Sequence, residues 1–268
     1  MSDSGQVAFS RQLKEAASIR EFGYSVMKGK HPGPFYRKDQ IAFSLFNRCL
    51  LAHEASEVLA GHSLVDDAWI VVRALVEHAV NCVYMLYVAD HQTAADFADY
   101  GDYLRYTGIR DLKRTSEAAL RVVLSQEDEE KQRIRFEAIR SRFDGKRGDK
   151  WCVDDALYKR AAHIDRPAPG TDTSHCATFL SLVNTVWRHA STYTHGTSGA
   201  LTKHARLDGK GFAIGRTYSE REAAQALFSA NLALYQVLLP VDQRLGGRYA
   251  SELAQRWKNW NSACEGLV

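Results

Sequence analysis

Apolar residues recur every three or four positions along most of the chain, which is the spacing of amphipathic helices. Turn-forming glycines and prolines separate the periodic stretches. The pattern predicts helices over residues 5–27, 36–60, 63–89, 93–124, 126–143, 172–197, 219–239 and 247–262. We therefore expect an all-α fold, with about seven or eight helices in a single helical-bundle domain over residues 1–268.

The stretch 63–89 is apolar on almost every face, which predicts the central helix of the core. A few residues join it to the helix over 36–60, so the two should pack as an antiparallel hairpin. The Ser63 hydroxyl is positioned to cap its start. Arg73, Glu77, His78 and Asn81 interrupt the apolar run, so no membrane span is expected.

The stretch 172–197 begins with residues that cap helices, buries an apolar stripe, and ends in ionisable and hydroxyl side chains. Its candidate caps are Asp172, Thr173 and Ser174, and its apolar positions are Phe179, Leu180, Val183, Val186 and Trp187. Gly196 is suited to close the helix.

Arg188 and His195 are expected to share one face of this helix. Seven residues bring a regular helix back to within roughly 20° of the same direction after a rise of about 10 Å. Ser191 and Thr192 lie between the two on that face. We therefore place the candidate site at this end of the helix.

Other local signals concern the ends of elements. Ser125 with Asp128 and Ser219 with Glu222 have capping-box spacing. Asp208 and Gly209 between short alternating runs predict a β-hairpin within residues 201–218. Pro240 is expected to kink or end the helix that begins near Ser219.

Composition describes an ordinary globular chain, with 45% hydrophobic and 25% charged residues. A net charge of +3 is too small to indicate nucleic-acid binding by itself. Five widely spaced cysteines, two of them (Cys49 and Cys82) in apolar helical runs, favour free thiols over disulfides. The first residues lack the pattern of a signal peptide. These features predict a reduced, cytoplasmic protein.

Several kinds of site have no matching motif. A carboxylate-bridged metal site in a helical bundle needs Glu-x-x-His on two helices. The nearest approach is His53-Glu54 with Glu57, for which a surface or lightly buried position is expected. Phosphate-binding loops and nucleophile elbows are also missing from the sequence. No metal and no cofactor are predicted.

Residues 131–150 hold eight Lys or Arg against three Asp or Glu. One interpretation is a solvated helix face followed by a loop. The other is a patch that attracts RNA phosphates. Its members would be Arg135, Arg140, Arg142, Lys146 and Arg147.

Arg73 and Glu77 lie one turn apart in the most apolar helix, at a spacing that allows an ion pair. The pair could be buried and fix helix packing. Alternatively, Arg73 or Glu77 could line a polar cleft that faces Arg188 and His195.

Arg188 and His195 fit Arg-x(4–6)-His, and the chain resembles HEPN-domain ribonucleases in this motif. His189 matches the polar residue that often follows the arginine. Arg48/His53 and Arg73/His78 also fit the spacing, but a five-residue step turns a helix by roughly 140° and separates their faces. Arg188/His195 is therefore the favoured pair.

A second resemblance covers roughly residues 40–240, and leaves the helices over 5–27 and 247–262 as additions. It is to an uncharacterised bacterial helical family, itself similar to the HEPN group, with Arg-x-x-x-Glu (here Arg73 and Glu77) and a late Ser-x-x-x-His (here Ser191 and His195). The resemblance implies a HEPN-like core and a metal-independent endoribonuclease in bacterial defence or a toxin–antitoxin system. It further implies RNA as substrate, a homodimer, and a possible antitoxin or defence partner.

In the implied reaction, His195 takes the proton of a ribose 2′-hydroxyl and Arg188 binds the phosphate. The alternative is a non-catalytic helical interaction or nucleotide/RNA-binding module. In that alternative Arg73/Glu77 and Arg188/His195 form a buried polar network.

Overall fold

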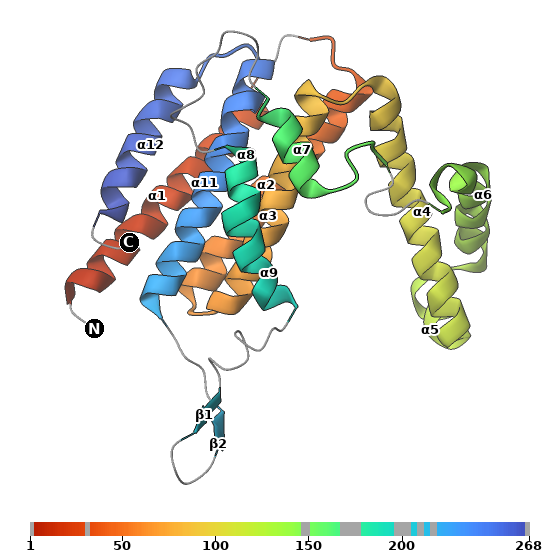
Figure 1. Ribbon diagram of the computed structural model, residues 1–268, viewed down its shortest axis with the longest axis horizontal. Coiled ribbons are helices and arrows are strands. Elements are labelled where there is room, and N and C mark those ends of the chain that lie inside the picture. The colour runs from red at the N-terminus through yellow and green to blue at the C-terminus, as the bar shows by residue number, and fades with distance from the viewer. Residues whose placement is uncertain are drawn as a thin grey trace.

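The computed structural model describes residues 3–29, 33–145, 151–166, 178–195, 205–207, 212–214 and 219–265. It confirms an all-α, single-domain bundle (Figure 1). Within these ranges there are ten helices when α8, η1 and α9 are counted as one, against the seven or eight expected.

The helices of the main bundle come from both halves of the chain. They are α1 (Asp3–Lys28), α2 (Arg37–Gly61), α3 (Val65–Tyr87), α7 (Leu157–Ile164), α8 (Phe179–Leu182), the π-helical turn η1 (Val183–Trp187), α9 (Arg188–Thr194), α11 (Glu220–Arg244) and α12 (Ala250–Cys264). Three more form an arm: α4 (His91–Thr115), α5 (Glu117–Val123) and α6 (Gln126–Phe143).

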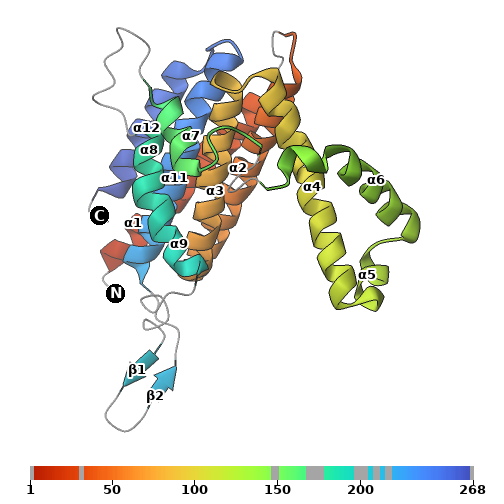
Figure 2. The ribbon, with the colours of Figure 1, turned by 45° about the vertical axis from the view of Figure 1, so that its right-hand side comes forward.

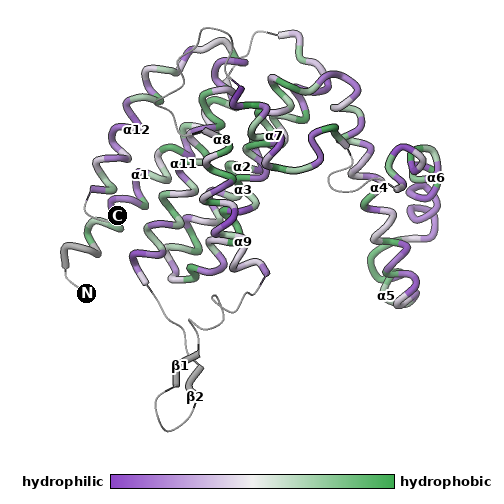
Figure 3. The backbone as a smooth tube through the Cα atoms, viewed as in Figure 1, coloured by the Kyte–Doolittle hydropathy of each residue, from purple (hydrophilic) through white to green (hydrophobic). Residues whose placement is uncertain are grey.

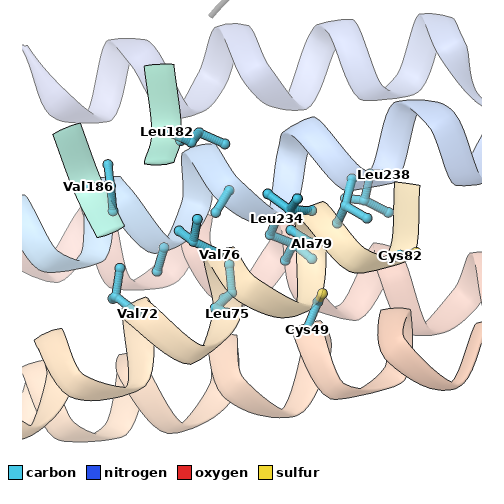
Figure 4. Close-up of a cluster of buried hydrophobic side chains, with 14 of the residues drawn as sticks. Cys49, Val72, Leu75, Val76, Ala79, Cys82, Leu182, Val186, Leu234 and Leu238 are labelled. Carbon is cyan, nitrogen blue, oxygen red and sulfur yellow. The ribbon is translucent and has the colours of Figure 1, made fainter. Parts of the chain in front are cut away.

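Helix α3 is the centre of the core, as its apolar sequence predicted. It packs against α2 and α11, while α7, η1 and α9 cover its remaining side. The close-up in Figure 4 shows side chains of α2, α3, η1 and α11 meeting there. Val72, Leu75 and Leu234 are fully buried. Since each such side chain contributes about 1.5–3 kcal/mol when buried, this contact dominates the stability of the bundle.

The predicted α2–α3 hairpin is confirmed, with residues 62–64 as its connection. Capping by Ser63 is wrong. Leu64 precedes the helix without a side-chain cap, and Ser63 has a φ of 63°. The connection is so short that Ser63 must take a left-handed turn conformation, which leaves its side chain no capping geometry.

The two predicted capping boxes do begin helices. The Ser125 and Ser219 hydroxyl oxygens accept hydrogen bonds from Asp128 N (3.1 Å) and Glu222 N (3.2 Å). Replacing Ser219 with alanine should therefore lower the free energy of unfolding by about 1 kcal/mol. Urea denaturation would measure this loss. Ser251→Ala, an exposed position in the first turn of α12, should change it by less than about 0.5 kcal/mol. Equal effects would contradict the cap.

Of the two outcomes expected at Pro240, a kink or an end of the helix, the end is wrong, because α11 continues to Arg244. Hydrogen bonds that involve residues distant in the sequence stabilise the helical turn that Pro240 weakens. The Tyr87 hydroxyl donates to the Pro240 carbonyl oxygen (2.8 Å). Arg244 donates two hydrogen bonds, of 2.8 and 2.7 Å, to the buried Asp39 carboxylate. Burial tends to raise the pKa of Asp39, but Arg244 and the Tyr36 backbone outweigh this and leave its pKa lowered.

The terminal helices, expected as additions to a core, are part of the same bundle. Helix α1 packs on both α11 and α12. Gln12 Nε2 donates to the Ala224 carbonyl oxygen (3.1 Å), and Arg256 Nη1 donates to the Ser18 carbonyl oxygen (3.1 Å). These contacts cover the outer face of α11.

Helices α4, α5 and α6 form an arm that projects from the bundle (Figure 2). Three of its buried residues, Tyr103, Phe136 and Phe143, form a hydrophobic cluster separate from the main core. Tyr100 and Tyr106, three residues on either side of Tyr103, pack against this cluster. The tyrosines of α4 therefore hold α6 in place.

Strands β1 (Ala205–Leu207) and β2 (Phe212–Ile214) pair antiparallel, with Arg206 opposite Ala213. The β-hairpin predicted within residues 201–218 is confirmed.

Figure 3 shows apolar stretches along α3 and α11, and polar ones along α6. Both α3 and α11 are long and apolar enough to cross a membrane, but 61% of the relevant window of each is buried inside the bundle. Burial of this extent is typical of helices that form the core of a bundle.

Candidate functional site

The helix that carries Arg188 and His195 is described from Phe179 onward. Its predicted caps, Asp172, Thr173 and Ser174, and its predicted closing residue Gly196 lie outside the described residues. At the first described turn, the Asp165 carboxylate accepts hydrogen bonds from Phe179 N (3.0 Å) and Leu180 N (2.6 Å). A negative charge suits the positive end of a helix. Asp165 therefore fixes this helix to the end of α7.

Arg188 and His195 lie at the two ends of α9, which is regular α-helix from Arg188 to Thr194. The His195 backbone N–H still donates to the Ser191 carbonyl oxygen (3.1 Å), so the helical spacing extends to His195. Both side chains are exposed. A seven-residue step on such a helix keeps them on one face, and their exposure rules out the buried network of the alternative interpretation.

A cavity of about 520 Å³ opens between α3, α7 and α9. Its lining joins segments far apart in the sequence: Arg73, Glu77, Asn81, Trp151, Tyr158, Arg160, Trp187 and Arg188 are among its residues. The polar cleft expected to join Arg73 or Glu77 to Arg188 and His195 is therefore present for Arg73, Glu77 and Arg188, but His195 is not among the residues that line it. Three guanidinium groups and the carboxylates of Glu77 and Asp155 lie on its wall. The guanidinium groups are suited to bind an anionic ligand.

Arg73, Glu77 and Trp187 form a fixed group on the wall of this cavity. Arg73 Nε lies 3.3 Å from Glu77 Oε1, and Trp187 Nε1 donates to the same oxygen (2.7 Å). The Arg73 guanidinium also lies over the Trp187 ring, 5.0 Å from its centroid. Their side chains are 21% (Arg73) and 38% (Glu77) exposed, so the expected ion pair is confirmed but is not buried.

Arg160 supports the opposite wall. It is almost fully buried, its Nη1 donates to the Asp154 carbonyl oxygen (2.9 Å), and its guanidinium lies 4.9 Å from the centroid of the Trp151 ring. Arg160 and Tyr158 were not predicted as site residues, because the short helix α7 has no long apolar repeat. Nothing in the local sequence indicates that these residues meet α3.

The hydroxyl groups between Arg188 and His195 are bonded to their own helix. Ser191 Oγ donates to the Trp187 carbonyl oxygen and Thr192 Oγ1 to that of His189, each at 2.7 Å. Their oxygens can still accept a hydrogen bond from a ligand.

His189 belongs to a different surface from Arg188. Its ring meets the Trp69 ring edge-on, with centroids 4.6 Å apart. It also lines a separate pocket of about 240 Å³ beside α11. His189 is therefore not among the residues that line the α3–α7–α9 cavity.

The described arginines of the candidate phosphate patch are all ion-paired. Arg142 pairs with Asp96 (3.2 Å) and Asp99, Arg140 with Glu137 (3.2 Å), and Arg135 approaches Asp102 at 4.0 Å. These pairs favour the solvated-face interpretation. Lys146 and Arg147 lie outside the described residues.

The other Arg/His pairs separate as the helical geometry predicted. Arg48 is exposed and His53 is fully buried. Arg73 lines the cavity, whereas His78 lies towards Arg48, where burial and the Arg48 charge lower the pKa of the imidazole.

His53 and Glu57 belong to a buried network. The surface or lightly buried position expected for His53-Glu54 with Glu57 is therefore wrong for His53, which is fully buried, whereas the Glu54 side chain is 46% exposed. His53 Nδ1 donates to Glu57 Oε1 (2.7 Å), and Nε2 meets the Asn231 side-chain amide at 2.7 Å. Arg20 Nε donates to Glu57 Oε1 (2.8 Å). We call Arg20, His53, Glu57 and Asn231 the buried network. It joins α1, α2 and α11, and the Arg20 and Glu57 side chains are only 13% and 10% exposed.

Two of the cysteines expected to be free, Cys49 and Cys82, are buried free thiols. Within the described ranges, no group of three or more His, Cys, Asp or Glu side chains is arranged to hold a metal ion.

Comparison with known proteins gave one result that bears on this chain. Neither the curated proteins nor the solved structures that were searched contain a match. A family model does match, over residues 39–212. This range runs from the start of α2 to the start of β2 and includes every cavity residue named above. Since it spans more than half of the chain, the protein belongs to DUF5677, a family of unknown function.

Proposed function

We propose that this protein is a metal-independent endoribonuclease of the HEPN type, with the site at the α3–α7–α9 cavity. The observation that carries the proposal is the position of Arg188. It shares an exposed face of α9 with His195 and lines a cavity that also holds Arg73 and Arg160. A general base or acid thus stands on the same helix face as a phosphate-binding group.

The chemistry requires two proton transfers. A base removes the proton of the ribose 2′-hydroxyl, and the 2′-oxygen attacks phosphorus. The P–O5′ bond breaks, the 5′-oxygen takes up a proton, and a 2′,3′-cyclic phosphate remains. Arg188 stabilises the charge that develops on the phosphate oxygens. An imidazole can serve as general base or as general acid, so His195 can carry either proton.

One imidazole cannot act as base and acid in the same step. A two-fold dimer that brings two His195 side chains together supplies both roles, and such dimers are the commonest oligomers. A cytoplasmic setting in bacterial defence or a toxin–antitoxin system, with a protein partner, belongs to the same proposal.

The test is incubation of the purified protein with RNA in excess chelator. Wild type should produce fragments with 2′,3′-cyclic phosphate and 5′-hydroxyl ends, and RNA with 2′-O-methyl groups should stay intact. His195→Ala should slow cleavage by about 100-fold or more. His62→Ala, which removes an exposed histidine far along the sequence, should not.

Equal cleavage by wild type and His195→Ala would remove His195 from the mechanism. RNA binding without any cleavage would instead support the non-catalytic binding module.

A further inference from the structure

We propose that the α3–α7–α9 cavity holds one nucleotide of the RNA, and that Asn81 and Tyr158 recognise its base. The identity of the ligand rests on the proposed function, whereas the shape and chemistry of the cavity do not. Its volume of about 520 Å³ lies within the range of roughly 300–1,000 Å³ that is usual for small-ligand sites.

Asn81 gives the first indication of a ligand. Its side-chain oxygen Oδ1 is buried without a hydrogen-bond partner, and the residue lines the cavity. A buried acceptor without a donor destabilises the free protein. A ligand that brings an N–H group to this oxygen removes that penalty. Every RNA base carries such a group on its pairing edge.

Tyr158 gives the second indication of a ligand. Its side chain lines the same cavity and is 50% exposed. The other aromatic walls are already engaged: the Trp187 ring faces Arg73, and the Trp151 ring faces Arg160. A base that stacks on the Tyr158 ring covers its exposed face, which is how aromatic side chains hold unpaired bases.

The charged side chains of the cavity indicate where the phosphate of the nucleotide binds. Glu77 and Trp187 hold Arg73 on the α3 wall, and Arg188 reaches the cavity from α9. The Asn81 acceptor lies one helical turn beyond Glu77 on α3. A nucleotide bound with its phosphate at Arg188 and its base towards Asn81 and Tyr158 satisfies both sets of groups.

Titration calorimetry with nucleoside 5′-monophosphates tests this pocket without any cleavage step. They should bind at least about tenfold more tightly than ribose 5-phosphate, which lacks a base. Tyr158→Ala should remove this preference and Tyr158→Phe should keep it. Arg48→Ala, which removes an exposed arginine of a different groove, is the matched control for charge.

Asn81→Leu separates recognition from structure. It should weaken nucleotide binding about tenfold without lowering the melting temperature, because it removes a buried unpaired acceptor. Asn47→Leu, at an exposed position of α2, should leave binding unchanged.

Equal affinities for the nucleotides and ribose 5-phosphate, or unchanged binding by Asn81→Leu and Tyr158→Ala, would overturn the inference. Nucleotide binding without RNA cleavage would uphold the pocket and reject the ribonuclease. RNA cleavage by a protein that shows no preference for the base would uphold the ribonuclease and reject the pocket.

Discussion

Arg188→Ala should reduce RNA cleavage by about 100-fold or more and leave the fold intact. Loss of a single group that stabilises the charge of the transition state typically has an effect of this size. The side chain is exposed, so its removal should change the free energy of unfolding by less than about 0.5 kcal/mol. Single-turnover cleavage rates and thermal denaturation of the same preparation would measure the two quantities.

Two further variants sharpen this test. Arg188→Lys keeps the charge but loses the planar pair of donors, and should recover only part of the rate. Arg48→Ala should cleave like the wild type. A large fall in melting temperature for Arg188→Ala, with no RNA cut by any variant, would instead show that Arg188 has a structural role.

Glu57→Ala should lower the free energy of unfolding by about 3–5 kcal/mol, the largest stability effect that we expect from a single charged side chain in this protein. The variant leaves Arg20 and His53 near each other without the carboxylate that both contact. Breaking a buried ion pair by removing one partner has this cost. Urea denaturation at neutral pH would measure it.

Glu54→Ala is the matched control. Glu54 lies on the same helix and pairs with the same Arg20 at 3.5 Å, but its side chain is 46% exposed against 10% for Glu57. An exposed pair contributes at most about 1 kcal/mol. Equal losses from the two variants would contradict a special role for the buried network.

The buried network should also make stability depend on pH. Burial tends to raise the pKa of the Glu57 carboxyl, but the bonds and charges of His53 and Arg20 outweigh it and leave its pKa below the ordinary value of 4.5. A lowered pKa in the folded state contributes stability above about pH 4.5, and this contribution is lost as the pH falls through the folded pKa. Glu57→Gln should therefore lose less stability than the wild type between pH 5 and pH 3.

What the sequence could predict about the fold is mostly local. The apolar repeats located α2 and α3, and the spacing of Ser219 and Glu222 located the start of α11. These features depend on neighbours within one or two turns. The helix continues past Pro240 because hydrogen bonds made by Tyr87 and Arg244 stabilise this turn. Both bonds join residues of different helices, so the local sequence does not indicate them.

The candidate site shows the same limit. The i,i+4 spacing of Arg73 and Glu77 predicted their pairing, and the helical step predicted a common face for Arg188 and His195. The bond from Trp187 to Glu77 joins residues 110 positions apart, and no local pattern indicates it. His53 looked like a surface residue because one of its two side-chain partners, Asn231, lies 178 positions away in the sequence.

The π-helical turn η1 affects how the end of this helix faces the rest of the protein. A turn closed by i→i+5 bonds accommodates about one residue more than a regular turn, and one residue corresponds to roughly 100° of rotation. The face that α9 presents to α3 is therefore out of phase with the face that α8 presents to the core. A helical wheel drawn without interruption from Phe179 to His195 would aim the Arg188 guanidinium in the wrong direction.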